Sequence, residues 1–226
     1  MEQRISLLGV DMDCLNVGQT MERIGSFLKN GQLNTVAVLT AESLLEAEAD
    51  PAYRELLQQF ALCLPGEQCI LEAAGLSCGE ISQELEGHGL YNRMFWSLIR
   101  SGMRFLIAGE TPEETAALRK YLQEEYTELC VVGEESGFSA EGASEDSVLN
   151  RINGLFPDVI LSGLDSREPE AFLFRNRKKL GGRIWISFGK DPYLRQQAGW
   201  KESLLKKTHR NMTFRRLIAK YPGREL

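Results

Sequence analysis

The 226-residue sequence has only two histidines, and it contains no run of 18 apolar residues. The missing apolar run argues against a membrane-spanning helix. A histidine-rich metal site is excluded because His88 and His209 are the only histidines. At the N-terminus, acidic residues interrupt MEQRISLLGVDMD before the apolar segment of a signal peptide can form. We therefore expect a cytoplasmic protein.

The cysteines have no diagnostic spacing, and the glycine-rich nucleotide-binding motifs are missing. The cysteines are Cys14, Cys63, Cys69, Cys78 and Cys130. Their number is odd and no pair has Cys-x-x-Cys spacing, so neither a disulfide framework nor a zinc site is indicated. Neither G-x-G-x-x-G nor G-x-x-x-x-G-K-[ST] occurs, so dinucleotide-binding and P-loop functions lack their motifs. We expect reduced, mostly buried thiols, no metal and no cofactor.

Charge is distributed unevenly along the chain. With 43% hydrophobic and 26% charged residues, the length suits one α/β domain with a short appendage. Residues 201–226 hold eight Lys/Arg and two Glu, a net charge of +6. Because the whole chain carries −6, residues 1–200 carry −12. We expect a domain at 1–200 and a basic tail at 201–226. The tail predicts an anionic partner, such as lipid or phosphate, or docking on the body itself. Nucleic acid is not expected, because the body is acidic.

Strand-like and helix-like segments alternate along the chain. The expected strands are Thr35–Leu39, Ala61–Leu64, Arg104–Ala108, Leu129–Val132, Val159–Leu161 and Arg183–Phe188. The expected helices are Gly18–Leu28, Ser43–Phe60 with a restart at Asp50-Pro51, Leu90–Ser101, Thr111–Tyr126, Ser144–Leu155, Glu168–Leu180 and Lys201–Lys220. Residues Gly75–Gly89 read as a loop. This alternation predicts a parallel sheet with helices on both faces.

Glycine follows several of these strands, at Gly109, Gly133, Gly163 and Gly189. Ligands of parallel sheets bind outside the carboxyl ends of the strands, and glycine lets a backbone approach them closely. The repeated pattern favours a ligand cleft, with ordinary turn chemistry as the alternative. Asp165 and Ser166 follow the fifth strand, where they suit either a sugar hydroxyl or a helix cap.

Four stretches together resemble a known family. They begin with NTVAVLTAESLLEAEADPAYRELLQQFALCLPGE and RFLIAGETPEETAALRKYLQEEYTELCVVGEESGF, and continue with PDVILSGLDSREPEAFLFRNRKKL and RIWISFGKDPYLRQQAGW. Their order and spacing resemble the WecG/TagA/CpsF glycosyltransferases over most of residues 7–190. The resemblance implies a Rossmann-like fold flanked by helices.

The same resemblance implies an activity and partners. The family transfers an N-acetylmannosamine-type sugar from a UDP donor to a lipid-linked acceptor during cell-surface polymer synthesis. The partners it implies are thus a UDP-sugar and a lipid-linked acceptor at the membrane surface, with the C-terminal tail meeting the membrane. The protein would then lie peripherally at the inner face of the membrane. The oligomeric state stays open, and a homo-oligomer is one alternative.

The family's polar residues are only partly present. Thr40 matches the threonine of T-x-N, but Glu42 replaces its asparagine. Gly66 stands where L-P-D-G has its aspartate, the family's candidate base, and Glu67 follows. Because a carboxylate is the usual base for a hydroxyl group, the candidate catalytic residues are Thr40, Glu67 and Glu42.

Other family motifs are altered as well. Glu84 and Gly89 stand where E-R-x-x-G-x-D has arginine and aspartate, and of P-K-Q-E only Glu170 matches. Arg216 matches the arginine of a C-terminal R-L-x-x-E-P-x-R. The candidate binding residues are Gly109, Gly133, Gly163, Asp165, Ser166, Glu170 and Arg216. Three hypotheses follow: a transferase with a relocated base, an inactive relative acting as a nucleotide-sugar sensor or interaction partner, or a purely structural interaction protein.

Overall fold

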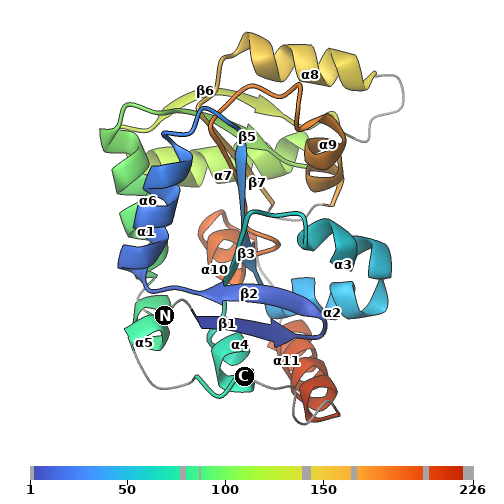
Figure 1. Ribbon diagram of the computed structural model, residues 1–226. Coiled ribbons are helices and arrows are strands. Elements are labelled where there is room, and N and C mark those ends of the chain that lie inside the picture. Colours follow the sequence, from blue (N-terminus) through green and yellow to red (C-terminus); the bar gives the residue numbers. More distant parts are fainter. Residues whose placement is uncertain are drawn as a thin grey trace.

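A parallel sheet forms the centre of the computed structural model, which describes residues 3–76, 80–86, 88–138, 144–163, 167–200 and 204–220. Its strands are β3 (Asn34–Leu39), β4 (Leu62–Pro65), β5 (Arg104–Ala108), β6 (Cys130–Glu135), β7 (Val159–Ser162) and β8 (Ile184–Ser187). Their order is β4-β3-β8-β7-β5-β6, and every pairing is parallel (Figure 1). The predicted α/β, Rossmann-like fold is therefore confirmed.

Helices cover both faces of this sheet, as the alternation predicted. On one face lie α2 (Ala41–Ala49), α3 (Pro51–Leu57), α4 (Gln68–Ala73), α8 (Glu145–Gly154), α9 (Glu168–Asn176) and α11 (Leu204–Ala219). The other carries α1 (Val17–Phe27), α6 (Gly89–Arg100), α7 (Pro112–Glu125) and α10 (Pro192–Gln197). Successive strand residues feed the two cores in turn: Ala37 and Leu39 join the first, whereas Val36 and Val38 join the second. This follows from the two-residue period of a strand.

Local signals placed the starts of α3 and α7 correctly. Thr111 caps α7 by accepting a hydrogen bond from the Glu114 N–H at 3.2 Å, with Pro112 in the first turn. Asp50 caps α3 in the same way, with Pro51 next. Each cap satisfies an N–H group that has no partner within its helix.

Several elements differ from the expectation. Strands β1 (Gln3–Leu7) and β2 (Val10–Cys14) form an antiparallel hairpin beside β4, where the Cys63 N–H donates to Asp13 Oδ2 at 3.2 Å. The Gly75–Gly89 stretch, expected as a loop, contains α5 (Glu80–Glu86). Strand β6 continues past Gly133, and α9 ends at Asn176 rather than Leu180.

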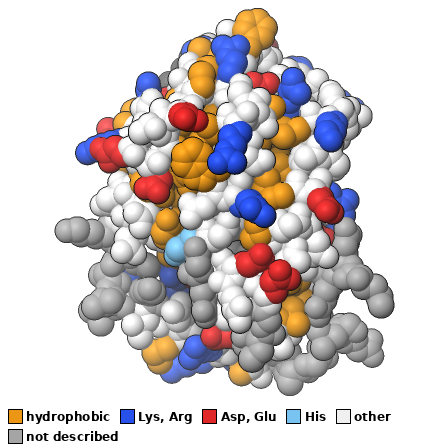
Figure 2. Space-filling view, turned by 90° about the vertical axis from the view of Figure 1, so that its left-hand side faces the viewer, with side chains coloured by type: hydrophobic (Ala, Val, Ile, Leu, Met, Phe, Trp, Pro, Cys, Tyr) orange, Lys and Arg blue, Asp and Glu red, His pale blue; other side chains and the backbone are white. Residues whose placement is uncertain are grey.

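The basic tail contains α11, as predicted, and this helix lies against α2 and α4 (Figure 1). Its inward side chains Arg210 and Phe214 are buried, whereas Met212, Arg216 and the following Lys220 are exposed. Among the described residues, no helix is long and apolar enough to cross a membrane. Figure 2 shows a different face, over α1 and α6, on which charges of both signs are interspersed with hydrophobic side chains. That face is not a basic surface.

Candidate functional site

The carboxyl ends of the parallel strands share one edge of the sheet, and glycines bring two of their loops together. Gly163 follows β7 with φ +96°, and Gly189 lies just beyond β8 with φ +47°. A Cβ on Gly163 would lie 3.0 Å from the Gly189 nitrogen, and a Cβ on Gly189 would lie 2.8 Å from Ser43 Oγ. Glycine is therefore required for this close approach, because any side chain would force the two loops apart.

Thr40 joins these loops to α2. It is fully buried, caps α2 by accepting from the Ser43 N–H at 3.1 Å, and donates to the Gly189 carbonyl at 2.9 Å. Because its hydroxyl is enclosed by these partners, the geometry favours a positioning role for Thr40 rather than direct contact with substrate.

A series of alternating charges follows the same edge. Glu42 and Glu46 lie four residues apart on α2 and share Lys190, whose Nζ is 3.6 Å from Glu42 Oε1 and 2.5 Å from Glu46 Oε1. Like charges at this spacing repel each other along a helix. Lys190, placed by the Gly189 turn, offsets that repulsion.

At one end, the series continues from Glu46 to Asp50. Arg167 Nε lies 3.9 Å from Glu46 Oε2, and Arg167 Nη2 donates to Asp50 Oδ2 at 2.8 Å. The guanidinium also lies 4.4 Å from the ring centroid of Tyr53, a cation–π geometry. Its hydrogen bond lowers the pKa of Asp50. Arg167 is therefore held in place by three groups.

At the other end, the series reaches Glu67. Arg195 Nη1 and Arg210 Nη1 lie 3.9 and 3.6 Å from Glu42 Oε2, and Arg210 Nη2 lies 3.8 Å from Glu67 Oε2. Glu67 Oε1 accepts from the Ala41 N–H at the start of α2, at 2.7 Å. Glu67 thus lies between a helix N-terminus and a buried arginine.

We call these eight residues the edge cluster. They are Asp50, Arg167, Glu46, Lys190, Glu42, Arg195, Arg210 and Glu67. Four carboxylates balance four cations, so the cluster as a whole is neutral. A cavity of about 380 Å³ opens beside it, lined by Glu46, Ala49, Asp50, Glu110, Arg167 and Lys190. It lies where open α/β sheets bind ligands, and its volume is in the range of small-molecule sites.

Two buried acids lie behind the edge cluster. Glu170 accepts a hydrogen bond from the Ser187 hydroxyl, while its Oε2 has no hydrogen-bond partner among the described residues. Burial raises the pKa of Glu170 to about 7. Asp191 accepts from the Tyr91 hydroxyl at 2.6 Å, and burial raises its pKa to about 6. Both acids therefore change charge near neutral pH.

Gly66, at the position of the family's aspartate, is packed against β3. Its N–H donates to the Leu39 carbonyl at 2.8 Å. A Cβ at Gly66 would lie 2.7 Å from Val38 Cγ1 and 3.0 Å from the Leu39 oxygen. The backbone here accommodates glycine and leaves no room for an aspartate side chain.

Several predicted binding residues do not line the cavity. Next to Gly109, the Glu114 carboxylate accepts the Glu110 N–H at 2.7 Å, and it would lie 2.9 Å from a Cβ on that glycine. Gly133 does not end its strand, because it lies within β6 and a Cβ there would be 2.5 Å from Leu155 Cδ1. Arg216 is exposed on α11. Asp165 and Ser166 lie outside the described residues.

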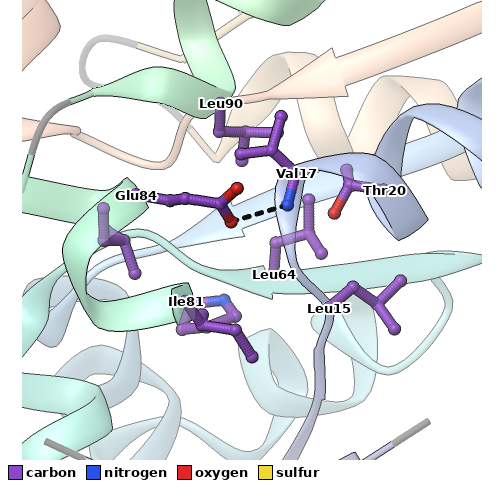
Figure 3. Close-up of a pocket in the computed structure, with 9 residues that line it drawn as sticks. Leu15, Val17, Thr20, Leu64, Ile81, Glu84 and Leu90 are labelled. Carbon is purple, nitrogen blue, oxygen red and sulfur yellow. Dashed lines mark hydrogen bonds between the residues drawn. The ribbon is translucent and has the colours of Figure 1, made fainter. Parts of the chain in front are cut away.

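Glu84, where the family pattern has arginine, belongs to a separate crevice (Figure 3). Its Oε2 accepts from the Val17 N–H at 2.8 Å, at the start of α1. Leu15, Leu64 and Leu90 line the same crevice, whose cavity of about 20 Å³ has room for little more than a water molecule. Glu84 therefore stabilises the start of α1 and takes no part in the edge cluster.

The sequence reasoning missed the cations of the edge cluster and Glu46. One signal for Arg210 was its position four residues before the apolar Phe214, which puts both on one face of a helix. A second was Lys190, which directly follows a strand-end glycine. Among the described residues, no group of three or more His, Cys, Asp or Glu is placed to hold a metal ion.

Comparison with known proteins shows the family to which the chain belongs. The Glycosyl transferase WecG/TagA/CpsF family matches residues 5–191. Relatives include the N-acetylglucosaminyldiphosphoundecaprenol N-acetyl-beta-D-mannosaminyltransferases of Staphylococcus aureus strains MRSA252 and NCTC 8325 / PS 47. Each is 22% identical over 188 residues, covering 82% of this chain and 73% of the relative. The chain therefore belongs to the WecG/TagA/CpsF family of glycosyltransferases.

Proposed function

We propose that this protein transfers an N-acetylhexosamine from a UDP-sugar to a lipid-linked acceptor in cell-surface polysaccharide or teichoic acid synthesis. The observation that carries the proposal is the edge cluster, in which Lys190 and Arg167 line a cavity at the carboxyl edge of the sheet and Glu67 lies at the other end of the same series of charges. Family membership supports the reaction class. The names of the relatives support N-acetylglucosaminyl-diphosphate lipid as the acceptor class.

The proposed chemistry is an inverting displacement. The acceptor hydroxyl attacks the anomeric carbon, the bond from that carbon to the diphosphate oxygen breaks, and UDP leaves. A base must take the hydroxyl proton, and Glu67 follows the position of the family's aspartate at the end of β4. Lys190 and Arg167 line the cavity and supply positive charge for the departing diphosphate.

The proposed location is peripheral, at the inner face of the membrane, because a lipid-linked acceptor is presented there. Helix α11 supports this proposal from two sides. Its buried Arg210 reaches Glu42 and Glu67, while its exposed Arg216 faces away from the core. The same helix therefore joins the edge cluster to a basic outer surface.

The test measures binding of UDP and UDP-N-acetylhexosamine by calorimetry, with UDP release followed in the presence of a lipid-linked acceptor. Glu67→Gln should keep donor binding and slow UDP release about 10²–10⁴-fold, the usual contribution of a general base. Glu72→Gln is the matched control, because Glu72 on α4 pairs with Arg215 outside the edge cluster. Equal release by Glu67→Gln and wild type would exclude Glu67 as the base.

A second candidate function is a nucleotide-sugar sensor or partner subunit without turnover. The packing of Gly66 favours it, because the position of the family's base cannot hold a side chain without movement of β3. The engagement of Glu67 with the Ala41 N–H and Arg210 also favours it. Binding of the UDP-sugar without release by wild type would support this candidate. Absence of binding would contradict both functions and leave a structural role.

A further inference from the structure

Three cations from three different segments converge on Glu42. Lys190 follows β8 and lies 3.6 Å from Oε1, while Arg210 of α11 and Arg195 of α10 lie 3.6 and 3.9 Å from Oε2. The Glu42 side chain is 29% exposed, so an ion from solvent can reach this group. Arg210, in contrast, is 8% exposed and is held within the fold.

Such convergence of cations is the arrangement with which proteins bind diphosphates, since Arg and Lys donate strong charge-assisted hydrogen bonds to phosphate oxygens. Here a carboxylate already lies among the three cations. Glu42 is one of the four carboxylates that balance the four cations, so its charge leaves the edge cluster without a net positive charge.

We infer that Glu42 is an internal competitor that occupies the three cations in place of a diphosphate and thereby sets the affinity of this protein for diphosphate ligands. The inference deepens the proposed function and rests on it for the identity of the ligand. A diphosphate gains access to Arg195 and Arg210 by displacing the Glu42 carboxylate, which carries a smaller charge than the incoming group.

The other acids of the edge cluster have different contacts. Glu46 contacts Lys190 and Arg167, on the side of the cavity. Glu67 is fixed by its 2.7 Å hydrogen bond from the Ala41 N–H. In the contacts described for this cluster, Glu42 meets Lys190 after β8, Arg195 of α10 and Arg210 of α11 together.

Two sources of diphosphate exist in the proposed reaction: the nucleotide sugar and the lipid-linked acceptor. The experiment therefore measures, by calorimetry on the full chain, the binding of inorganic pyrophosphate, UDP and farnesyl diphosphate. Glu42→Gln should bind pyrophosphate about tenfold more tightly than wild type, because one competing charge is removed without a large change in volume. A matching gain for UDP identifies the nucleotide as the source, and one for farnesyl diphosphate identifies the lipid.

Glu48→Gln is the matched control. Glu48 lies on the same helix and its carboxylate is 3.9 Å from Arg54, away from the edge cluster. Glu42→Asn removes the same charge with a shorter side chain, so an equal gain in both Glu42 variants attributes the effect to charge. Unfolding curves establish that each variant is folded.

Several outcomes decide the inference separately from the proposed function. Equal affinity for all three probes in wild type and both Glu42 variants, absence of pyrophosphate binding, or an equal gain in Glu48→Gln would overturn it. If the Glu42 variants gain affinity for pyrophosphate while no protein binds UDP or releases it from a UDP-sugar, the inference stands and the proposed function fails. If wild type turns over UDP-sugar and the Glu42 variants gain nothing, the inference alone fails.

Discussion

Gly66 directly follows β4 and lies so close to β3 that even the methyl group of an alanine would collide with it. Gly66→Ala places a Cβ 2.7 Å from Val38 Cγ1 and 3.0 Å from the Leu39 oxygen, and neither a β-branched side chain nor a backbone carbonyl can move freely. We expect the free energy of unfolding to fall by about 1–3 kcal/mol, the usual cost of overpacking. Urea unfolding measures this change.

Gly25 supplies the control for that substitution. It lies inside α1, and a Cβ there would meet no heavy atom within 4 Å. Gly25→Ala should therefore raise the free energy of unfolding by about 0.5–1 kcal/mol, because alanine favours the helix. A Gly66→Ala protein at least as stable as wild type would show that the end of β4 shifts readily, and that an acid could return to this position.

The buried carboxyl of Glu170 predicts a dependence of stability on pH. Its pKa is about 7 in the folded protein against an ordinary value of 4.5, so the folded state binds the proton more tightly. Through this group, stability is greatest below pH 4.5, falls as the pH rises toward 7, and is fully reduced above it. Glu170→Gln removes this contribution to the pH dependence of stability. Above pH 7, it should be about 1–3 kcal/mol more stable than wild type.

Thermal or urea unfolding from pH 4.5 to 8 measures this difference, with Asp191 expected to contribute to the slope in both proteins because its pKa is raised to about 6. Glu145→Gln is a suitable control. Interactions with Asn176 and Arg175 lower the pKa of Glu145, so its contribution is lost only at more acidic pH. Parallel stability curves for wild type and Glu170→Gln would contradict the prediction.

At the scale of elements, the sequence predicted those boundaries that depend on near neighbours. The caps Thr111 and Asp50 bond to groups two or three residues away, so their role is legible in the chain itself. The hairpin of β1 and β2 was missed because its Leu8-Gly9 turn lacks the usual Asn-Gly or Asp-Gly signal, although both residues have positive φ. Gly133 misled the assignment of β6, since its role is to leave space for Leu155.

The candidate site was predictable only in part, for a related reason. Glu67 and Gly163 follow parallel strands, whose carboxyl ends share one edge whatever the details of packing. The ion pairs depend on tertiary structure instead: Arg167 and Asp50 are 117 positions apart, and Lys190 and Glu46 are 144 apart. No local pattern specifies such partners.

Helix α11 shows how one element can satisfy two of the alternatives that the sequence left open. Arg210 and Phe214 are buried against the body, in keeping with a tail that docks on an acidic domain. Met212, Arg216 and Lys220 remain exposed, in keeping with a surface helix that meets an anionic partner. Docking on the body and the proposed membrane contact would therefore use different faces of the helix and would not compete.

At the scale of the whole molecule, charge separation decides how the protein would approach a membrane. The chain carries −6 overall, and anionic lipid would repel most of its surface. The exposed Lys206, Arg215, Arg216 and Lys220, on α11 and just after it, oppose this repulsion on one side only. The molecule should thus approach anionic lipid with the outer face of α11 leading, and the edge cluster lies on the inner side of that helix.

Charge reversal on that outer face tests the approach. Arg216→Glu combined with Lys220→Glu should reduce co-sedimentation with phosphatidylglycerol vesicles at least about tenfold, since each basic residue near such a surface contributes about 1 kcal/mol. High salt should weaken wild-type binding in the same way, because screening shortens the reach of the charges. Arg100→Glu combined with Lys120→Glu makes the same change in net charge on exposed residues of α6 and α7. If this control loses as much binding as the α11 variant, net charge alone governs association and α11 has no orienting role.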